Sequence, residues 1–222
     1  PRSTQGVSSA ASDVYKRQHK GLLPIDHYKK DVDDIVSTPL ECDWESLREE
    51  VIKYGVRNST LSAQMPSESS SVVSNETNGI EPPRDYLSIK KSKKGPLKQI
   101  VPGYPHLKNF YTLLWEQPNN DGYIKIVAIM QKFFDQAISG NWSYNPEHYD
   151  NNEVPLSEMA KDMLTTYKYG WKTSYYQNTY DSKTDEDILT EEAVDTISND
   201  HYEDYKDYGP DVDDEDCDAC AI

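Results

Sequence analysis

Two adjacent tyrosines and a pair of cysteines near the end of the chain are the residues best suited to redox chemistry. Tyr175 and Tyr176 lie in the strand-like segment 172–179, and Cys217 and Cys220 lie in the last six residues. Two phenols in contact can pass an electron together with a proton, and two thiols can deliver reducing equivalents by disulfide exchange. Together the two pairs indicate radical and disulfide chemistry.

Each pair also has a plainer interpretation. Tyrosine favours strands and occurs 17 times in this chain. Adjacent strand residues point to opposite faces, so Tyr175 and Tyr176 can stack only if the strand departs from regular geometry. Cys217 and Cys220 lie in an acidic segment that keeps thiols protonated. They are therefore either a mobile dithiol that works after being carried into a less acidic pocket, or part of an inert tail. No histidine stands at ligand spacing, so no metal site is expected.

A third candidate is the segment 66–70, Pro-Ser-Glu-Ser-Ser, at the predicted start of a helix. Free backbone amides at a helix N-terminus attract anions, so a phosphate or diphosphate would fit there. Simple capping by Ser67 or Ser69 is the alternative, and composition alone favours it. A polar cluster around Gly79 either lines a ligand pocket or makes a turn; its members are Asn75, Asn78 and Glu81.

Alternating helices and strands are predicted to position these residues. The helix over 44–54 has Asp43 as its cap and Gly55 as its stop, and the helix over 121–139 has a wide apolar face. Further helices are expected over 66–79, 106–117 and 155–170, and strands over 58–65, 86–89, 98–101 and 172–179. This alternation predicts an α/β fold, and the small number of strands indicates part of a larger sheet or barrel.

Charge divides the chain into a balanced body and an acidic tail. The whole chain has a net charge of −16, and residues 181–222 hold 17 Asp and Glu but only two Lys, a net charge of −15. Residues 1–180 therefore carry −1. The tail is expected to be disordered, because its charges repel and it has few aliphatic groups to bury. The lysines of 90–94 are interpreted as a solvated turn, so nucleic acid is not an expected partner.

Other features bear on compartment and chain ends. Three cysteines are too few for a disulfide framework, which favours the cytoplasm, and Cys42 is expected to be buried without a role. No apolar stretch approaches the roughly 20 residues of a membrane span, so no membrane partner is expected. Residues 1–18 show neither hydrophobic periodicity nor a signal peptide and are expected to be a non-native or disordered leader, with the chain a fragment.

Six motifs together resemble the C-terminal part of the class I ribonucleotide reductase large subunit, over a stretch from about Lys20 to Ile222. They are Arg57-Asn-Ser-Thr-Leu-Ser-Ala63, Met65-Pro-Ser-Glu-Ser-Ser70, Asn78-Gly-Ile-Glu-Pro-Pro-Arg84, Asn120-Asp-Gly-Tyr123, Met130-Gln-Lys132 and Tyr175-Tyr-Gln-Asn-Thr179. The resemblance implies the C-terminal part of a ten-stranded α/β barrel over 19–180, followed by a flexible acidic tail over 181–222.

The resemblance also implies roles for individual residues. Tyr175 and Tyr176 match a stacked pair that passes a radical from the small subunit's metal-tyrosyl cofactor towards the active site. Cys217 and Cys220 match a tail dithiol that reduces the active-site disulfide and is itself reduced by thioredoxin or glutaredoxin. Two residues separate these cysteines where relatives often have four, which leaves the external reductant open. The residues that match the substrate-diphosphate site are Pro66, Ser67, Glu68, Ser69 and Ser70.

The implied reaction is the reduction of ribonucleoside diphosphates to deoxyribonucleoside diphosphates for DNA synthesis. Its implied partners are the small subunit, a second copy of the full-length subunit, and thioredoxin or glutaredoxin. The helix near 156–169 resembles the region where the small subunit's C-terminal peptide docks. ATP and dNTP effectors would bind an N-terminal part that this sequence lacks.

This fragment is expected to bind no cofactor itself and to be inactive alone, because the family's radical cysteine and its Asn and Glu partners are missing from it. A free-standing thiol–disulfide oxidoreductase and an acidic-tail interaction protein are the two alternatives.

Overall fold

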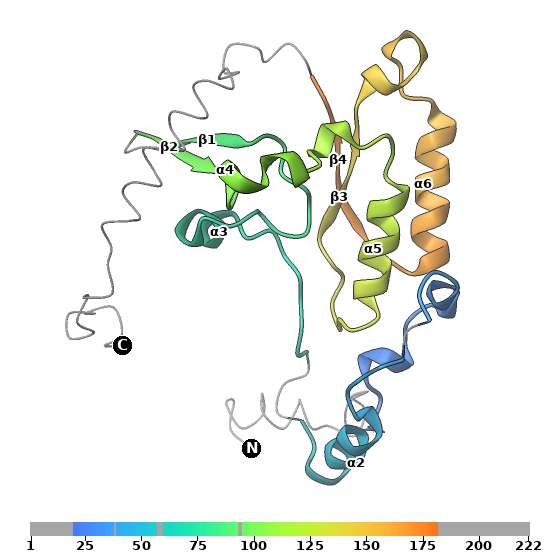
Figure 1. Ribbon diagram of the computed structural model, residues 1–222. Coiled ribbons are helices and arrows are strands. Elements are labelled where there is room, and N and C mark those ends of the chain that lie inside the picture. The colour runs from blue at the N-terminus through green and yellow to red at the C-terminus, as the bar shows by residue number, and fades with distance from the viewer. Residues whose placement is uncertain (1–19, 38, 57–59, 93–94, 182–222) are drawn as a thin grey trace, which may run out of the picture.

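Helices and two small sheets make up the computed structural model, which describes residues 20–37, 39–56, 60–92 and 95–181. Helices α5 (Asp121–Gln131) and α6 (Leu156–Tyr169) contact each other on one side of the parallel pair β3 (Gly140–Tyr144) and β4 (Ser174–Thr179) (Figure 1). The antiparallel hairpin of β1 (Leu87–Ser92) and β2 (Gly95–Ile100) lies on the other side. The fold is therefore α/β, as predicted.

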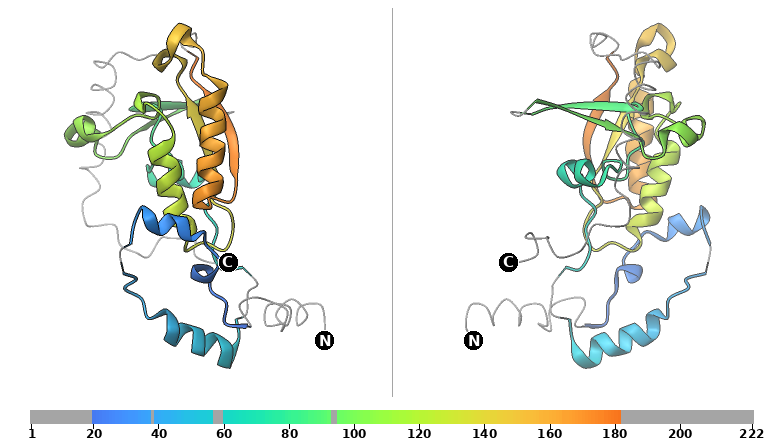
Figure 2. Two further views of the ribbon diagram at one scale, coloured as in Figure 1. Left: turned by 90° about the vertical axis from the view of Figure 1, so that its right-hand side faces the viewer. Right: turned by 60° about the vertical axis from the view of Figure 1, so that its left-hand side comes forward.

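Shorter helices complete the described ranges. Helix α3 (Glu68–Ser74) and helix α4 (Tyr104–Leu107) lie near the hairpin, whereas helix α2 (Trp44–Tyr54) lies apart from both sheets (Figures 1 and 2). Single turns of 3₁₀ helix occur at Pro24–Asp26, Lys30–Asp34, Lys108–Phe110, Leu114–Glu116, Pro146–His148 and Asp150–Asn152. Among helices in the described ranges, none combines the length and the apolar character that crossing a membrane requires.

The larger core lies between α5, α6 and the parallel pair. Ile124, Val127 and Ile138 have no exposed surface. Trp171, just after α6, packs edge-on against Tyr123, with ring centroids 5.8 Å apart, and donates from Nε1 to the carbonyl of Ile138 at 2.9 Å. A buried indole with its N–H satisfied fixes the start of β4 against α5 and β3.

A buried polar network also joins these elements. The Asp162 carboxylate on α6 accepts hydrogen bonds from Asn120 Nδ2 at 2.8 Å and from Tyr144 Oη at 3.1 Å. Asn120 Oδ1 in turn accepts from the backbone N–H of Ser143 at 2.9 Å. Burial raises the pKa of the Asp162 carboxyl, although both hydrogen bonds oppose that rise. The network therefore connects the start of α5, the end of β3 and the middle of α6.

Two predicted helices have the expected residues at their ends, and the predicted hairpin and last strand are also present. The Asp43 side chain accepts from the N–H of Ser46 at 3.0 Å where α2 begins, and Gly55 follows its end. Pro155 precedes α6, and Gly170 ends it with a φ of +83°, in the left-handed region that glycine adopts readily. The predicted hairpin is confirmed by the β1–β2 pairing, and the predicted strand over 172–179 is confirmed as β4.

Helix α5 ends eight residues before the predicted limit of 139. The buried side chain of Gln131 donates from Nε2 to the carbonyls of Phe134 and Gln136, at 3.2 and 2.8 Å, and its Oε1 accepts from the N–H of Ile138 at 3.0 Å. These bonds hold the chain in a turn that replaces the next helical turns. The apolar residue Ile138 belongs to a buried extended segment instead of the helix.

Other predictions were wrong. The region 106–117 is not one helix, because Tyr111 and Leu113 have extended backbones and Tyr111 Oη bonds to the carbonyl of Pro102 at 2.8 Å. The predicted strand over 58–65 is not formed in the part that the structure describes, where β-pairing is limited to one parallel bridge between Gln64 and Ile138. Helix α3 stops at Ser74 instead of near Gly79, since Asn75 adopts a left-handed conformation. Cys42 is exposed, and β3 was not predicted.

Candidate functional site

Tyr175 and Tyr176 contact each other directly on β4. Their ring centroids lie 4.3 Å apart, and the ring planes meet at 65°, an edge-on arrangement. Both side chains are well exposed, at 60% and 59%. The two phenols are thus close enough to exchange an electron with each other and accessible to a further partner.

An irregular register in the parallel pair makes this contact possible. Gly140 pairs with Ser174, but the next paired residue of β3, Trp142, is matched with Gln177. The two tyrosines therefore lie opposite one residue, Asn141, in a β-bulge. The bulge is the departure from regular strand geometry that was expected of a stacked pair, but the rings meet edge-on and are not stacked.

The position of Gly140 beside the bulge is determined by its neighbours. A Cβ atom there would overlap Tyr123 Oη and would lie 3.0 Å from the Trp171 ring. Glycine lets β3 pass close to α5 and to the start of β4. The core therefore fixes the backbone of Asn141 from one side, while its side chain faces the tyrosines.

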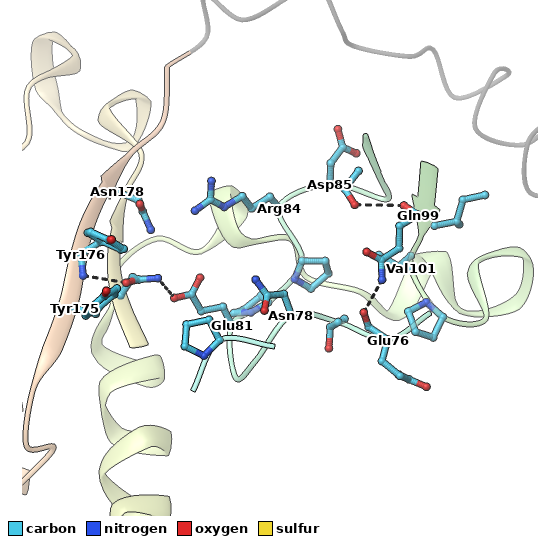
Figure 3. Close-up of a pocket in the computed structure, with 18 residues that line it drawn as sticks. Glu76, Asn78, Glu81, Arg84, Asp85, Gln99, Val101, Tyr175, Tyr176 and Asn178 are labelled. Atoms are coloured by element: carbon cyan, nitrogen blue, oxygen red, sulfur yellow. Dashed lines mark hydrogen bonds between the residues drawn. The ribbon is translucent and has the colours of Figure 1, made fainter. Parts of the chain in front are cut away.

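Both tyrosine rings line a cavity of about 730 Å³ between the parallel pair and the hairpin (Figure 3). The opposite wall comes from the segment before β1 and from the end of β2. Figure 3 shows Glu81 and Arg84 extending between these walls, with Asn78 beside Glu81. The lining residues that carry charge or amide groups are Glu76, Asn78, Glu81, Arg84, Asp85, Gln99, Asn141 and Asn178.

Glu81 is the half-buried carboxyl of this cavity. Burial raises its pKa, whereas the hydrogen bond from Asn141 Nδ2 and the positive charge of Arg84 oppose the rise. Burial also raises the pKa of Tyr123 beneath it, and the charge of Glu81 adds to that effect. The cavity thus contains a carboxyl group that is sensitive to what binds beside it.

The predicted anion-binding segment 66–70 reaches this cavity at one point. Pro66 is among the lining residues. Ser67 precedes α3 without forming a side-chain capping bond, and its backbone N–H donates to Asn78 Oδ1 at 2.8 Å. The capping interpretation therefore fails for Ser67, and Ser69 lies within the helix itself.

The polar cluster around Gly79 was expected either to line a ligand pocket or to make a turn, and its members do both. Asn78 and Glu81 line the cavity, whereas Asn75 ends α3. Gly79 itself has a φ of +66°, which belongs to the turn that brings Glu81 towards β3. A turn and a pocket wall are thus formed by the same few residues.

Two site predictions lie outside the described residues, namely Cys217 and Cys220, as does the expected disordered tail. Asn141, the residue of the cavity that bonds to the tyrosine bulge, was not predicted. Its signal was the alternation of buried Gly140, Trp142 and Tyr144 with partly exposed Asn141 and Ser143, which is typical of a strand with one side in a core.

Comparison with known proteins gives a consistent set of relatives. Residues 14–177 match the family described as ribonucleotide reductase, barrel domain. Ribonucleoside-diphosphate reductase 1 subunit alpha of Salmonella typhimurium is 61% identical over 166 residues, which is 75% of this chain and 22% of that protein. Its Escherichia coli counterpart is 60% identical over the same shares. The alpha subunit of Enterobacteria phage T4 is 46% identical over 84% of this chain and 25% of its own length. The chain thus spans between a fifth and a quarter of these relatives.

Proposed function

The chain belongs to the ribonucleotide reductase family through its barrel domain, and from this premise we propose that it carries the radical-transfer and substrate-phosphate parts of an enzyme that reduces ribonucleoside diphosphates. The observation that supports this most directly is the contact of Tyr175 and Tyr176 in a cavity that Pro66 also lines. Two predicted sites more than 100 residues apart in sequence thus meet at one cavity.

The tyrosine pair supplies the redox step. When one ring is a neutral tyrosyl radical, it takes one electron and one proton from the other phenol, which becomes the radical in its place. Atoms and electrons balance within the pair, and no net charge develops. The 4.3 Å separation of the rings supports direct exchange, and their exposure supports exchange with a partner on one side. We assign that partner to the small subunit, whose metal-tyrosyl cofactor would supply the radical.

The segment 66–70 supplies the diphosphate site. Helix α3 begins at Glu68, so the backbone amides of its first turn lack helical partners and can bind an anion. Arg84 adds a positive charge to the cavity that Pro66 also lines. The carboxylates of the cavity would repel a free phosphate, so the amides and Arg84 must orient the substrate.

The remaining parts of the proposal concern the larger protein. The parallel β3–β4 pair and the parallel bridge between Gln64 and Ile138 support the proposal that residues 19–180 form the C-terminal part of a ten-stranded barrel. Residues 181–222 would form the acidic tail, where Cys217 and Cys220 would reduce the active-site disulfide and be reduced by thioredoxin or glutaredoxin. A homodimer of the large subunit and effector sites for ATP and dNTP outside this chain complete the proposal.

The test is a chimeric enzyme in which this chain replaces the matching segment of the Salmonella alpha subunit, assayed with that organism's small subunit. We expect the chimera to reduce a ribonucleoside diphosphate. Tyr175→Phe or Tyr176→Phe should lower turnover to background, because phenylalanine preserves the packing but is far harder to oxidise. Tyr54→Phe, at an exposed tyrosine on the distant α2, is the matched control and should retain turnover. Activity that survives either of the first two changes would contradict the proposal.

A further inference from the structure

Asn141 takes the place of a missing ladder partner in the β-bulge. A bulge leaves a backbone group without its regular strand partner. Here the N–H of Tyr176 donates to Asn141 Oδ1 at 2.9 Å, so a side chain of β3 satisfies the backbone of β4. The same amide donates from Nδ2 to Glu81 Oε1. Asn141 therefore bonds to the tyrosine bulge with one end and to the cavity wall with the other.

The side chain at position 141 must both accept and donate a hydrogen bond, as an amide does. Asn and Gln are the side chains that present one accepting oxygen and one donating nitrogen in a single plane. A carboxylate could accept from Tyr176 but could not donate to Glu81, and the two negative charges would repel. A short apolar side chain would remove both of these hydrogen bonds. The two bonds of Asn141 thus require both functions of its side chain.

The backbone around Asn141 cannot shift to compensate. Gly140 is enclosed by Tyr123 and Trp171, and Trp142 is 5% exposed in the main core. The side chain between them is consequently presented at a fixed place. Figure 3 shows Glu81 directed towards the tyrosine side of the cavity, where the hydrogen bonds from Tyr176 through Asn141 to Glu81 are drawn in sequence.

We propose that Asn141 is a positioning residue that holds Tyr175 and Tyr176 in contact, and that its own orientation is set by Glu81 in the substrate cavity. This inference rests on the proposed radical transfer by the tyrosine pair. Asn141 and Glu81 take no part in the electron transfer itself. Their hydrogen bond couples the wall of the cavity to the geometry of the pair, so the separation of the rings depends on a residue that faces the substrate.

The experiment exchanges the donor and the acceptor of this hydrogen bond in the chimeric enzyme. N141D places two acidic groups against each other and should lower turnover at least about tenfold, since small misplacements of reacting groups have large effects on rate. E81Q retains an accepting oxygen for Asn141 and is the reference against which the double variant is measured. The double variant N141D/E81Q restores one donor and one acceptor in reverse order, and its turnover should recover to the E81Q level.

Two further measurements separate positioning from folding. Asn119→Asp is the matched control, because it makes the same change at an exposed residue whose oxygen continues to accept from the N–H of Asp121. It should retain wild-type turnover. In the 222-residue chain, hydrogen exchange at the amide of Tyr176 should be faster in N141D and slow again in N141D/E81Q. A purely structural role for Asn141 would instead speed exchange throughout the core, including at Trp142, and not only at Tyr176.

The outcomes distinguish this inference from the proposed function. If Tyr176→Phe abolishes turnover while N141D matches wild type, or while E81Q fails to rescue it, the positioning role is overturned and the radical-transfer role stands. If Tyr176→Phe retains turnover, the radical-transfer role fails and the positioning role fails with it. Should thermal melting show that N141D does not fold, Glu81→Ala replaces it as the test, because it leaves the strand unaltered. Wild-type turnover in that variant would overturn the proposal.

Discussion

At the scale of single residues, Gly140 is the position where the core leaves least room. Tyr123 Oη and the Trp171 ring occupy the space that a side chain at Gly140 would need. By contrast, a Cβ at Gly122 in α5 would meet nothing within 4 Å. We expect Gly140→Ala to lower the free energy of unfolding by about 1–3 kcal/mol, because the overlap forces the strand or the ring to move. Urea unfolding of the 222-residue chain measures the change.

The matched control is Gly122→Ala, the same substitution where space is available. It should leave stability unchanged or raise it by up to about 1 kcal/mol, because alanine favours the helix. Equal effects of the two substitutions would show that the crowding at Gly140 does not limit stability. The double variant of Gly140→Ala with Tyr123→Phe should recover part of the loss, since the phenol oxygen is the atom in the way.

At the scale of elements, the buried carboxyl of Asp162 makes the packing of α6 depend on pH. Its pKa is raised by burial, so protonation favours the folded state. Its contribution to stability is fully present below the unfolded pKa of about 3.8 and is lost as the pH rises through the folded pKa. We therefore expect Asp162→Asn to be more stable than wild type at pH 7, with the difference disappearing near pH 3.8, as measured by urea unfolding across pH.

Asp33 is the control of opposite sign. Its pKa is lowered chiefly by the hydrogen bond from Lys132 Nζ at 2.6 Å and then by that from Tyr28 Oη at 2.8 Å. Its contribution is present above pH 3.8 and is lost as the pH falls through the folded pKa. Asp33→Asn should therefore be less stable than wild type at pH 7. Parallel pH dependence in the two variants would contradict this account.

How far the elements could be predicted depends on how local their determinants are. Helices α2 and α6 were predicted because Asp43, Gly55, Pro155 and Gly170 act within one turn of the helix ends. The end of α5 was not predicted correctly, because it depends on hydrogen bonds from the Gln131 side chain to carbonyls of the following turn. The helical periodicity of the sequence does not reveal these bonds.

The candidate site divides in the same way. Adjacency in the sequence drew attention to the tyrosine pair, but their contact was implied by the family resemblance, and an irregular strand followed only as its condition. The polar residues near Gly79 were flagged with two possible roles. The contribution of Asn141 could not be predicted, because its partners Glu81 and Tyr176 are 60 residues before it and 35 residues after it. Register between distant strands determines that contact, and the local pattern contains no information about it.

At the scale of the whole molecule, the cavity is assembled from segments that span residues 66–178. The proposed tail has a separate role, which is to reduce the active-site disulfide of the same enzyme. We expect replacement of Cys217 and Cys220 by Ser in the chimeric enzyme to spare turnover driven by a small dithiol. Turnover driven by thioredoxin or glutaredoxin should fall to background, because thiolate attack on the active-site disulfide is lost.

Cys42→Ser is the matched control, since Cys42 is exposed and lies on the loop before α2. It should leave turnover with both kinds of reductant unchanged. If the double tail variant still turns over at the wild-type rate with the protein reductant, another route of reduction serves the enzyme, and the role assigned to Cys217 and Cys220 is wrong.

The bulge in β4 also fixes how many residues the strand must contain. Side chains alternate between the two faces of a regular strand, so one extra residue shifts this alternation by one position. Tyr175 and Tyr176 therefore both line the cavity, and regular pairing resumes at Gln177. Deleting a single residue between Ser174 and Gln177 would return the strand to its regular count. A single tyrosine would then lie opposite Asn141, and no second ring from this segment would share the cavity with it. The length of this segment is therefore as much a part of the site as its composition.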